Sequence, residues 1–243
     1  MKLYVVGLGP GEQSQMTVKA LEAIKNSDTI VGYGVYVDLI KDIVEGKEII
    51  TTPMKKEVDR CHMAVKAAIS GKNVSMVSSG DAGIYGMAGL VIEVLSEYEN
   101  HNVEVEVIPG ITAASSASSV LGAPLTHDFA VISLSDLLTP WEHIEKRLSL
   151  ASEAGFVICL YNPSSKKRAD YLNKACEIVM KNLPKDTPCG FVKNIAREGQ
   201  ESVILTLEEL KDAKVDMFTT VVIGNRTTKI VDGKLVTPRG YNI

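Results

Sequence analysis

The sequence predicts an α/β protein made of two α/β domains, residues 1–121 and 122–243. Strand-like apolar runs alternate with amphipathic, helix-like stretches, a pattern typical of a mainly parallel sheet covered by helices. In the first half of the chain, three of the apolar runs each lead into a loop of small residues. In the second half, Asp232-Gly233 separates two short apolar runs, which predicts that the second sheet ends in an antiparallel hairpin.

The first domain alternates regularly between the two kinds of element. Its apolar runs predict strands over Leu3–Val6, Asp28–Val31, Val74–Val77 and Val103–Ile108. Apolar residues at helical spacing predict helices over Thr17–Lys25, Val58–Ile69, Ile84–Leu95 and Ala113–Leu121. Gly71 follows the second of these helices and stands where a carboxyl-terminal stop is usual.

The pattern breaks around residues 121–125, and a new series of elements follows. The later apolar runs predict strands over Phe129–Leu134, Phe156–Tyr161, Cys189–Val192 and Phe218–Ile223. A capping-box pattern at Thr139–Glu142, with proline at the first helical position, predicts a helix that runs to about Ala151. A further helix is expected over Lys166–Lys181, and Thr206–Glu209 forms a second capping box.

Composition narrows the class of protein. The 243 residues are 45% hydrophobic and 23% charged, as in globular proteins, and no apolar run reaches the ~20 residues of a membrane span. The chain opens directly on strand-like residues, so we expect a cytoplasmic protein. A net charge of −4 argues against nucleic-acid binding, and four scattered cysteines without C-x-x-C spacing argue against a metal site.

The three small-residue loops indicate a ligand site. They are Gly7–Gly11, Ser79–Gly86 and Pro109–Ala114, and each follows a predicted strand. Loops at the carboxyl ends of parallel strands converge on one crevice, where α/β proteins bind their ligands. Glycines and other small residues let the backbone approach a bound molecule closely. The sequence therefore predicts a sizeable small-molecule cofactor.

A dinucleotide cofactor does not suit these loops. The third glycine of the G-x-G-x-x-G pattern is replaced by Glu12, and Pro10 removes one backbone N–H from the loop. No acidic residue stands at the end of the second strand, where Gly32-Tyr33 is found. No loop offers the G-x-x-x-x-G-K-[ST] pattern of nucleoside triphosphate sites.

The same loops carry a family resemblance. Gly7-x-Gly9-Pro10-Gly11, Gly80-Asp81, Pro109–Ala113 and Tyr161-Asn162 occur in the order and spacing of the tetrapyrrole (class III) methyltransferases, and the likeness runs from Leu3 to the end of the chain. Further segments resemble one branch, the precorrin-3B or cobalt-precorrin-3 C(17)-methyltransferases of cobalamin biosynthesis. These segments are Gly32–Tyr36, His127–Trp141, Leu160–Pro163 and Thr237–Tyr241.

The resemblance implies S-adenosylmethionine as the methyl donor, with S-adenosylhomocysteine as product, an active site in the cleft between the domains, and a homodimer. It also implies a set of residues that border the donor. This set is Pro10, Gly80, Asp81, Ile84, Thr112, Ala113, Asn162, Ile195, Ala196 and Thr220. Many relatives have proline where this chain has Ala82, which removes one argument for a rigid loop while leaving the backbone contacts possible.

The acceptor implied by the resemblance is a corrinoid precursor fringed by acetate and propionate arms. Basic residues are the natural partners of these carboxylates, Arg239 above all, because its guanidinium binds bidentately. The other candidates are Lys55 and Lys56 with Arg60, Lys166-Lys167-Arg168, and Arg197, and each could equally be solvated surface charge.

This branch also contracts the macrocycle to the precorrin-4 level, which calls for proton transfers. We hypothesise that His127 and Asp136 act as acid or base, or orient an acceptor hydroxyl. Asp136 could instead be a turn residue. Tyr33 stands where the related uroporphyrinogen methyltransferases carry an aspartate, so its phenol either approaches the macrocycle or packs against Tyr36.

The residues leave several alternatives open. One is a sibling methylase that acts at another ring carbon, or on ribosomal RNA or diphthamide. Another is a tetrapyrrole-binding carrier or regulator that transfers no methyl group. A nicotinamide oxidoreductase is a third reading, and the sequence does not distinguish a cobalt-containing substrate from a metal-free one.

Overall fold

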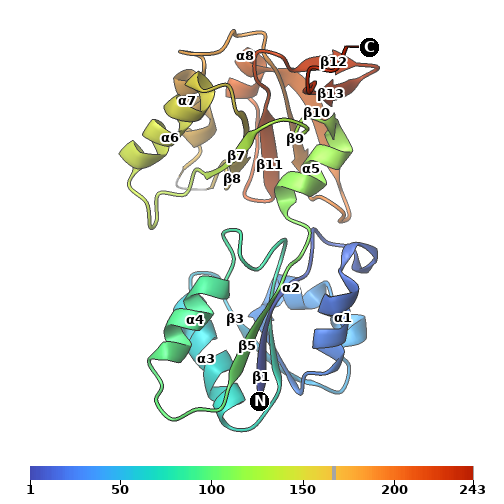
Figure 1. Cartoon of the computed structure of the whole chain (residues 1–243), viewed down its shortest axis with the longest axis vertical. Coiled ribbons are helices and arrows are strands. Elements are labelled where there is room, and N and C mark those ends of the chain that lie inside the picture. Colours follow the sequence, from blue (N-terminus) through green and yellow to red (C-terminus); the bar gives the residue numbers. More distant parts are fainter. Residues whose placement is uncertain (166–167, 243) are drawn as a thin grey trace. The chain divides into compact units, whose positions relative to one another are not determined.

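A computed structural model describes residues 1–165 and 168–242 of the chain (Figure 1). Two compact units are present, Met1–Ala113 and Ala114–Ile243. The boundary predicted from the sequence lies one helix later, after residue 121. Helix α5 (Ala113–Leu121), which we assigned to the end of the first domain, thus falls almost wholly within the second unit.

The first unit is built on a parallel five-stranded sheet of order β3-β2-β4-β1-β5. Its strands are β1 (Lys2–Gly7), β2 (Thr29–Tyr33), β3 (Glu48–Thr52), β4 (Val74–Ser78) and β5 (Glu104–Ile108). The predicted parallel sheet is confirmed, with β3 as an additional edge strand that the sequence analysis did not identify. Gly7 pairs with Ser78, so β1 and β4 end side by side.

Helices cover both faces of this sheet (Figure 1). They are α1 (Val18–Lys25), α2 (Gly34–Asp38), α3 (Glu57–Ile69) and α4 (Ala88–Ser96), with single 3₁₀ turns at Gln13–Gln15 and Lys41–Ile43. Neighbouring strand residues point to opposite faces. Val5 accordingly joins the core under α3 and α4, and Val6 joins the core under α1 and α2.

The order of the strands places a topological switch point between β1 and β4. The chain leaves β1 through α1 toward β2, whereas it leaves the adjacent β4 through α4 toward β5. Because α1 and α4 lie on opposite faces, the two loops diverge at the carboxyl ends of neighbouring strands. Ligands of open α/β sheets bind at such points.

The second unit has a mixed sheet of order β10-β9-β11-β8-β7. Its strands are β7 (Phe129–Ser133), β8 (Val157–Tyr161), β9 (Pro188–Lys193), β10 (Glu201–Thr206) and β11 (Thr219–Ile223). Only the β7–β8 pair is parallel, and the other neighbours are antiparallel. Strand β10 is not among the strands predicted from the sequence.

The hairpin predicted at Asp232-Gly233 is confirmed, and it belongs to a sheet of its own. Strands β12 (Lys229–Val231) and β13 (Lys234–Val236) pair antiparallel, and β13 also pairs with β6 (Gly122–Ala123). Asp232 and Gly233 both have positive φ, at 47° and 71°, as a two-residue hairpin loop with a right-handed twist requires.

The helices of the second unit test the two predicted capping boxes. The helices after α5 are α6 (Trp141–Glu153), α7 (Tyr171–Val179) and α8 (Leu207–Lys211). The box at Thr206 is confirmed, since its side chain and that of Glu209 cap each other's backbone. The box at Thr139 is wrong: Pro140 is the N-cap of α6, and no side chain caps it. Lys166 and Lys167, at the expected start of α7, lie outside the described residues.

All four cysteines are buried thiols (Cys61, Cys159, Cys176 and Cys189). Burial raises the pKa of the first three to about 12 and also raises the pKa of Cys189. Such thiols stay protonated and unreactive near neutral pH. Within the described ranges, no helix has both the length and the apolar character needed to cross a bilayer.

Candidate active site

The carboxyl edge of the first sheet is built from closely packed backbone. Gly9 and Gly80 form a bridge of two backbone hydrogen bonds between the loops after β1 and β4, with nitrogen-to-oxygen distances of 3.0 and 2.7 Å. A Cβ on Gly7 would lie 2.6 Å from the carbonyl oxygen of Gly80, and a Cβ on Gly110 would lie 2.2 Å from it. The glycines that the sequence singled out are thus required because three backbones meet here.

The Asp81 carboxylate joins two of these loops. One oxygen accepts the N–H groups of Gly83 and Ile84, at 2.8 and 3.2 Å, and the other accepts that of Gly110, at 3.0 Å. The carbonyl of the buried Ala82 accepts the N–H of Ala88. These bonds hold residues 82–87 in turns, which is why α4 begins at Ala88 instead of Ile84.

The loops present apolar side chains and backbone groups at their surface. Ile84, Tyr85 and Ile111 are 40%, 57% and 38% exposed. Six predicted donor-binding residues lie on these loops. They are Pro10, Gly80, Asp81, Ile84, Thr112 and Ala113. The loops contain no Lys or Arg, so a phosphate would find no countercharge in them.

Other predicted residues of the first unit follow β2 and β3 at the same edge. Tyr33 ends β2 and packs edge-on against Tyr36, with ring centroids 5.3 Å apart. Lys55 and Lys56 follow β3 and are exposed, and the ammonium of Lys56 lies 2.9 Å from Asp59. Arg60 is buried and donates to Thr52 and to the Pro53 carbonyl, so it serves the fold.

A second cluster of predicted residues lies along one edge of the second sheet. By the pairing register, this edge holds the carboxyl ends of β7, β8 and β9 and the amino end of β11. Asn162 has φ +52° and donates to Ser133 at 2.9 Å. Ala196 donates its N–H to Gln200 at 2.7 Å, and its neighbour Ile195 is buried, as is Thr220. The structure thus brings together all the donor-binding positions predicted for this unit.

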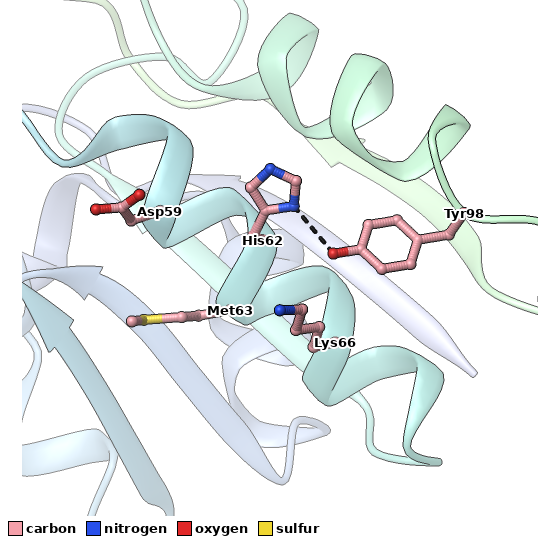
Figure 2. A pocket seen from close by; sticks show the side chains of 5 residues that line it. All are labelled: Asp59, His62, Met63, Lys66 and Tyr98. Atoms are coloured by element: carbon pink, nitrogen blue, oxygen red, sulfur yellow. Dashed lines mark hydrogen bonds between the residues drawn. The ribbon is translucent and has the colours of Figure 1, made fainter.

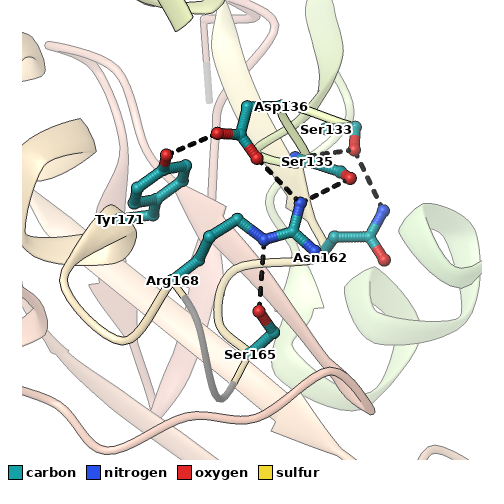
Figure 3. Close-up of polar contacts among 7 residues, drawn as sticks. All are labelled: Ser133, Ser135, Asp136, Asn162, Ser165, Arg168 and Tyr171. Carbon is teal, nitrogen blue, oxygen red and sulfur yellow. Dashed lines mark hydrogen bonds and ion pairs between the residues drawn. The ribbon is translucent and has the colours of Figure 1, made fainter. Parts of the chain in front are cut away.

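Asp136 shares this edge and lies in a polar network (Figure 3). Its two carboxylate oxygens accept hydrogen bonds from Tyr171, at 2.6 Å, and from Arg168, at 3.2 Å. The Tyr171 hydrogen bond is the largest influence, and with smaller contributions from the backbone and Arg168 it lowers the pKa of Asp136. The carboxylate is therefore held in its ionised form.

His127 and Arg239 lie at the opposite end of the second unit. His127 precedes β7 whereas Asp136 follows it, so the five-residue strand, about 17 Å long, separates them. The His127 side chain is 49% exposed, and its Nδ1 accepts the N–H of Asp128. Thr126 donates to the Thr237 carbonyl, which places the chain leading to the exposed Arg239 near this end too. The length of β7 thus separates the two side chains, and the catalytic roles predicted for His127 and Asp136 stay predictions.

A surface pocket of about 390 Å³ lies on the helical layer of the first unit (Figure 2). It is lined by Asp59, His62, Met63 and Lys66 of α3 and by Tyr98, whose hydroxyl is 2.9 Å from His62 Nδ1. None of the predicted site residues lines it. Among the described residues, no group of three His, Cys, Asp or Glu side chains is placed to hold a metal ion.

Residues 2–211 match the family of tetrapyrrole (corrin/porphyrin) methylases. The chain belongs to this family. A probable cobalt-factor III C(17)-methyltransferase of Salmonella typhimurium is 48% identical over 99% of this chain and 100% of its own length. A precorrin-3B C(17)-methyltransferase of a Sinorhizobium species is 41% identical over 98% and 96% of the two chains. The methylase spans about half the length of some other curated relatives.

Solved structures agree with the fold of this methylase. The methyltransferase CobJ is similar with a TM-score of 0.90 and 36% identity, covering 97% of this chain and 99% of that one. A uroporphyrin-III C-methyltransferase of Thermus thermophilus, complexed with S-adenyl homocysteine, has a TM-score of 0.72 at 19% identity over 92% and 97% of the chains. The second likeness concerns the fold alone.

Proposed function

We propose that this methylase transfers a methyl group from S-adenosylmethionine to C(17) of precorrin-3B or cobalt-precorrin-3, with ring contraction to the precorrin-4 level, in cobalamin biosynthesis. The observation that carries the proposal is identity of 41–48% along the whole chain with relatives named for C(17) methylation. The segments that resemble the C(17)-methyltransferases support the same choice, because they occur in both halves of the chain, for example at Gly32–Tyr36 and at Thr237–Tyr241.

The first-unit loops fit the donor by their chemistry. Bound S-adenosylmethionine supplies an electrophilic methyl group on a positively charged sulfonium. The absence of Lys and Arg from these loops disfavours a phosphate, and the exposed side chains of Ile84 and Ile111 offer apolar contacts to the donor. Among the described residues, the buried Ser78 Oγ has no hydrogen-bond partner at this edge. The proposed donor-binding residues are the ten predicted from the resemblance.

The protein's own contribution to methyl transfer is alignment and the exclusion of water. An in-line displacement needs no metal, and good alignment of two reactants lowers a barrier by about 7–11 kcal/mol. We assign Tyr33, at the carboxyl edge of β2, a place beside the acceptor, and Lys55 and Lys56 the binding of acceptor carboxylates at the same edge. Arg239 is a further candidate for carboxylate binding at the far end of the second unit.

The decisive experiment is turnover with a defined acceptor. The purified protein is incubated with S-adenosylmethionine carrying a ¹³C-labelled methyl group and either precorrin-3B or the cobalt-containing acceptor. Release of S-adenosylhomocysteine, together with a new ¹³C methyl signal at C(17) by NMR, supports the proposal and distinguishes the two acceptors. A methyl group at another carbon would identify a sibling enzyme. Pigment binding without release of S-adenosylhomocysteine would identify a non-catalytic tetrapyrrole-binding protein.

The proposal also covers the cellular location and the oligomeric state of the protein. We expect a homodimer, as the family resemblance implies, and a cytoplasmic protein, as predicted from the sequence. Light scattering coupled to size exclusion measures the mass in solution, and a mass near twice 26.3 kDa agrees with a dimer. A mass near 26.3 kDa would show a monomer.

A further inference from the structure

Arg168 connects two loops at the carboxyl ends of the parallel strands β7 and β8 (Figure 3). It belongs to the loop after β8 and reaches across to the loop after β7. Its Nη1 donates to Ser135 Oγ at 2.6 Å and to Asp136 Oδ1 at 3.2 Å. Its Nε donates to Ser165 Oγ at 3.1 Å. The side chain is only 16% exposed, so the guanidinium is held in one orientation.

Asp136 is itself fixed from the other side. Tyr171 donates its hydroxyl to Asp136 Oδ2 at 2.6 Å, and the Tyr171 ring packs on Trp141 with ring centroids 4.5 Å apart. Both carboxylate oxygens thus have partners, and the group stays ionised at neutral pH. A general acid must hold a proton at the working pH, and a general base must have a free oxygen directed at the substrate. Asp136 meets neither requirement well.

The guanidinium keeps unused donor capacity. Its planar fork carries five N–H groups. One on Nε and two on Nη1 serve Ser165, Ser135 and Asp136, and within residues 1–165 and 168–242 no acceptor lies within hydrogen-bond distance of Nη2. Ser135 and Ser165 accept from Arg168, so their own hydroxyl protons are directed elsewhere. The cluster is therefore rich in donors and short of acceptors.

The charge of the cluster limits the ligand that would complete it. Asp136 already balances Arg168, so a doubly charged phosphate would leave an excess of negative charge. A carboxylate carries a single charge, and its two coplanar oxygens match a planar guanidinium edge. The acceptor proposed above is fringed by acetate and propionate arms of this kind.

We propose that Arg168 binds a carboxylate arm of the methyl acceptor and that Asp136 is a positioning residue that orients this guanidinium. The inference rests on the proposed function, since it takes a tetrapyrrole as the acceptor. It gives Asp136 a role other than proton transfer. It also identifies one arginine, held between two loops, among the basic residues that the sequence offers as partners of the acceptor carboxylates.

The test compares Arg168→Lys, Asp136→Asn and the control Arg147→Lys, a substitution of an exposed arginine on α6. Lysine keeps the charge but cannot form the fork. We expect Arg168→Lys to raise the KM of the acceptor at least about tenfold, with the KM of S-adenosylmethionine and kcat within about twofold of wild type. Asp136→Asn raises the same KM and leaves the pH profile of kcat unchanged. The control variant behaves as wild type.

A second measurement changes the acceptor and compares wild type with Arg168→Lys. Methyl esters of the acceptor, made one arm at a time, remove one carboxylate each. One ester is expected to bind wild type weakly, and Arg168→Lys is expected to discriminate little between that ester and the free acid.

Each contrary outcome has a distinct meaning. An unchanged acceptor KM in Arg168→Lys overturns the proposal, and so does an increase confined to the KM of S-adenosylmethionine, because the bound carboxylate would then belong to the donor. Loss of one limb of the kcat pH profile in Asp136→Asn would restore a proton-transfer role to Asp136. Wild-type protein that methylates no tetrapyrrole would refute the proposed function itself.

Discussion

The two edges that carry the predicted donor-binding residues are constructed differently. In the first unit the loops after β1, β4 and β5 meet through backbone atoms, with Gly9, Gly80 and Gly110 in close contact. In the second unit the loops after β7 and β8 are joined by side chains, above all Arg168 and Asp136. The difference predicts two kinds of sensitivity. The first edge tolerates no added atom, whereas the second depends on particular charges and hydroxyl groups.

The largest expected effect comes from adding one methyl group to the backbone-built edge. Gly110→Ala places a Cβ 2.2 Å from the Gly80 carbonyl oxygen and 2.6 Å from that of Gly7, so backbone must move. We expect a loss of about 3 kcal/mol in the free energy of unfolding, and loss of S-adenosylhomocysteine binding in calorimetry.

The matched control is Gly89→Ala. Gly89 lies inside α4, and a Cβ there meets nothing within 4 Å. Alanine in a helix interior is favoured over glycine by roughly 0.5–1 kcal/mol, so this variant is expected to be as stable as wild type or slightly more stable. Equal melting curves for the Gly110 and Gly89 variants would contradict the picture of a backbone-built edge.

Removing the Asp81 carboxylate, which joins the loops after β4 and β5, should have the next largest effect. Asp81→Ala leaves the N–H groups of Gly83, Ile84 and Gly110 without their acceptor. We expect a destabilisation of about 2 kcal/mol, measured by urea unfolding, and weaker binding of S-adenosylhomocysteine. Asp59→Ala removes an exposed ion pair with Lys56 and is expected to change stability by less than about 1 kcal/mol. Equal losses in the two variants would show that Asp81 does not organise the loops.

The side-chain-built edge can be weakened without changing its shape. Tyr171→Phe removes the hydrogen bond that contributes most to the lowered pKa of Asp136, so this pKa is expected to rise toward its ordinary value of 3.8. A carboxyl whose pKa is lowered by folding stabilises the protein above its unfolded-state pKa, and that contribution is lost as the pH falls through the folded-state pKa. The variant should therefore lose it at a higher pH than wild type. ¹³C NMR titration of the Asp136 carboxyl group measures the shift, and identical titrations would contradict it.

The smallest effect is expected at His127, which lies at the amino end of β7, away from the predicted donor-binding residues of the second unit. His127 is half exposed, and β7 separates it from Asp136. On this geometry His127→Ala is expected to retain kcat and the yield of ring-contracted product within about twofold, as is usual for a surface substitution. A loss of ring contraction with methyl transfer intact would instead support the sequence-based hypothesis that His127 moves protons.

Most of the fold was predictable because its signals are local. Short apolar runs ended by glycines marked β1, β4 and β5, and Thr206–Glu209 marked the start of α8. The missed strands, β3 and β10, are edge strands. Each pairs along one side only, and β3 has one fully buried residue, Thr52, whereas β10 has none, so neither carries a fully buried apolar run. The false capping box at Thr139 shows that sequence spacing alone does not establish a cap.

The site was predictable to the extent that its residues follow strands directly. The loops after β1, β4 and β5 fall at one edge for this reason, as do Asn162, Ile195 and Ala196 in the second unit. The pairing of Arg168 with Asp136 was not predictable, since 32 positions separate them and the contact exists only once β7 lies beside β8. His127 and Asp136 are close in sequence, but they lie at opposite ends of β7, and this separation depends on where the strand begins and ends.

The burial of all four cysteines has a practical consequence. None of them offers a reactive thiolate to maleimide dyes near neutral pH, so we expect these dyes to leave the wild-type chain unlabelled. A cysteine introduced at the exposed Val18 of the first unit and another at the exposed Leu138 of the second would be the only reactive positions. Fluorescence energy transfer between dyes on this pair would then measure the distance between the two labelled positions, in solution and during turnover.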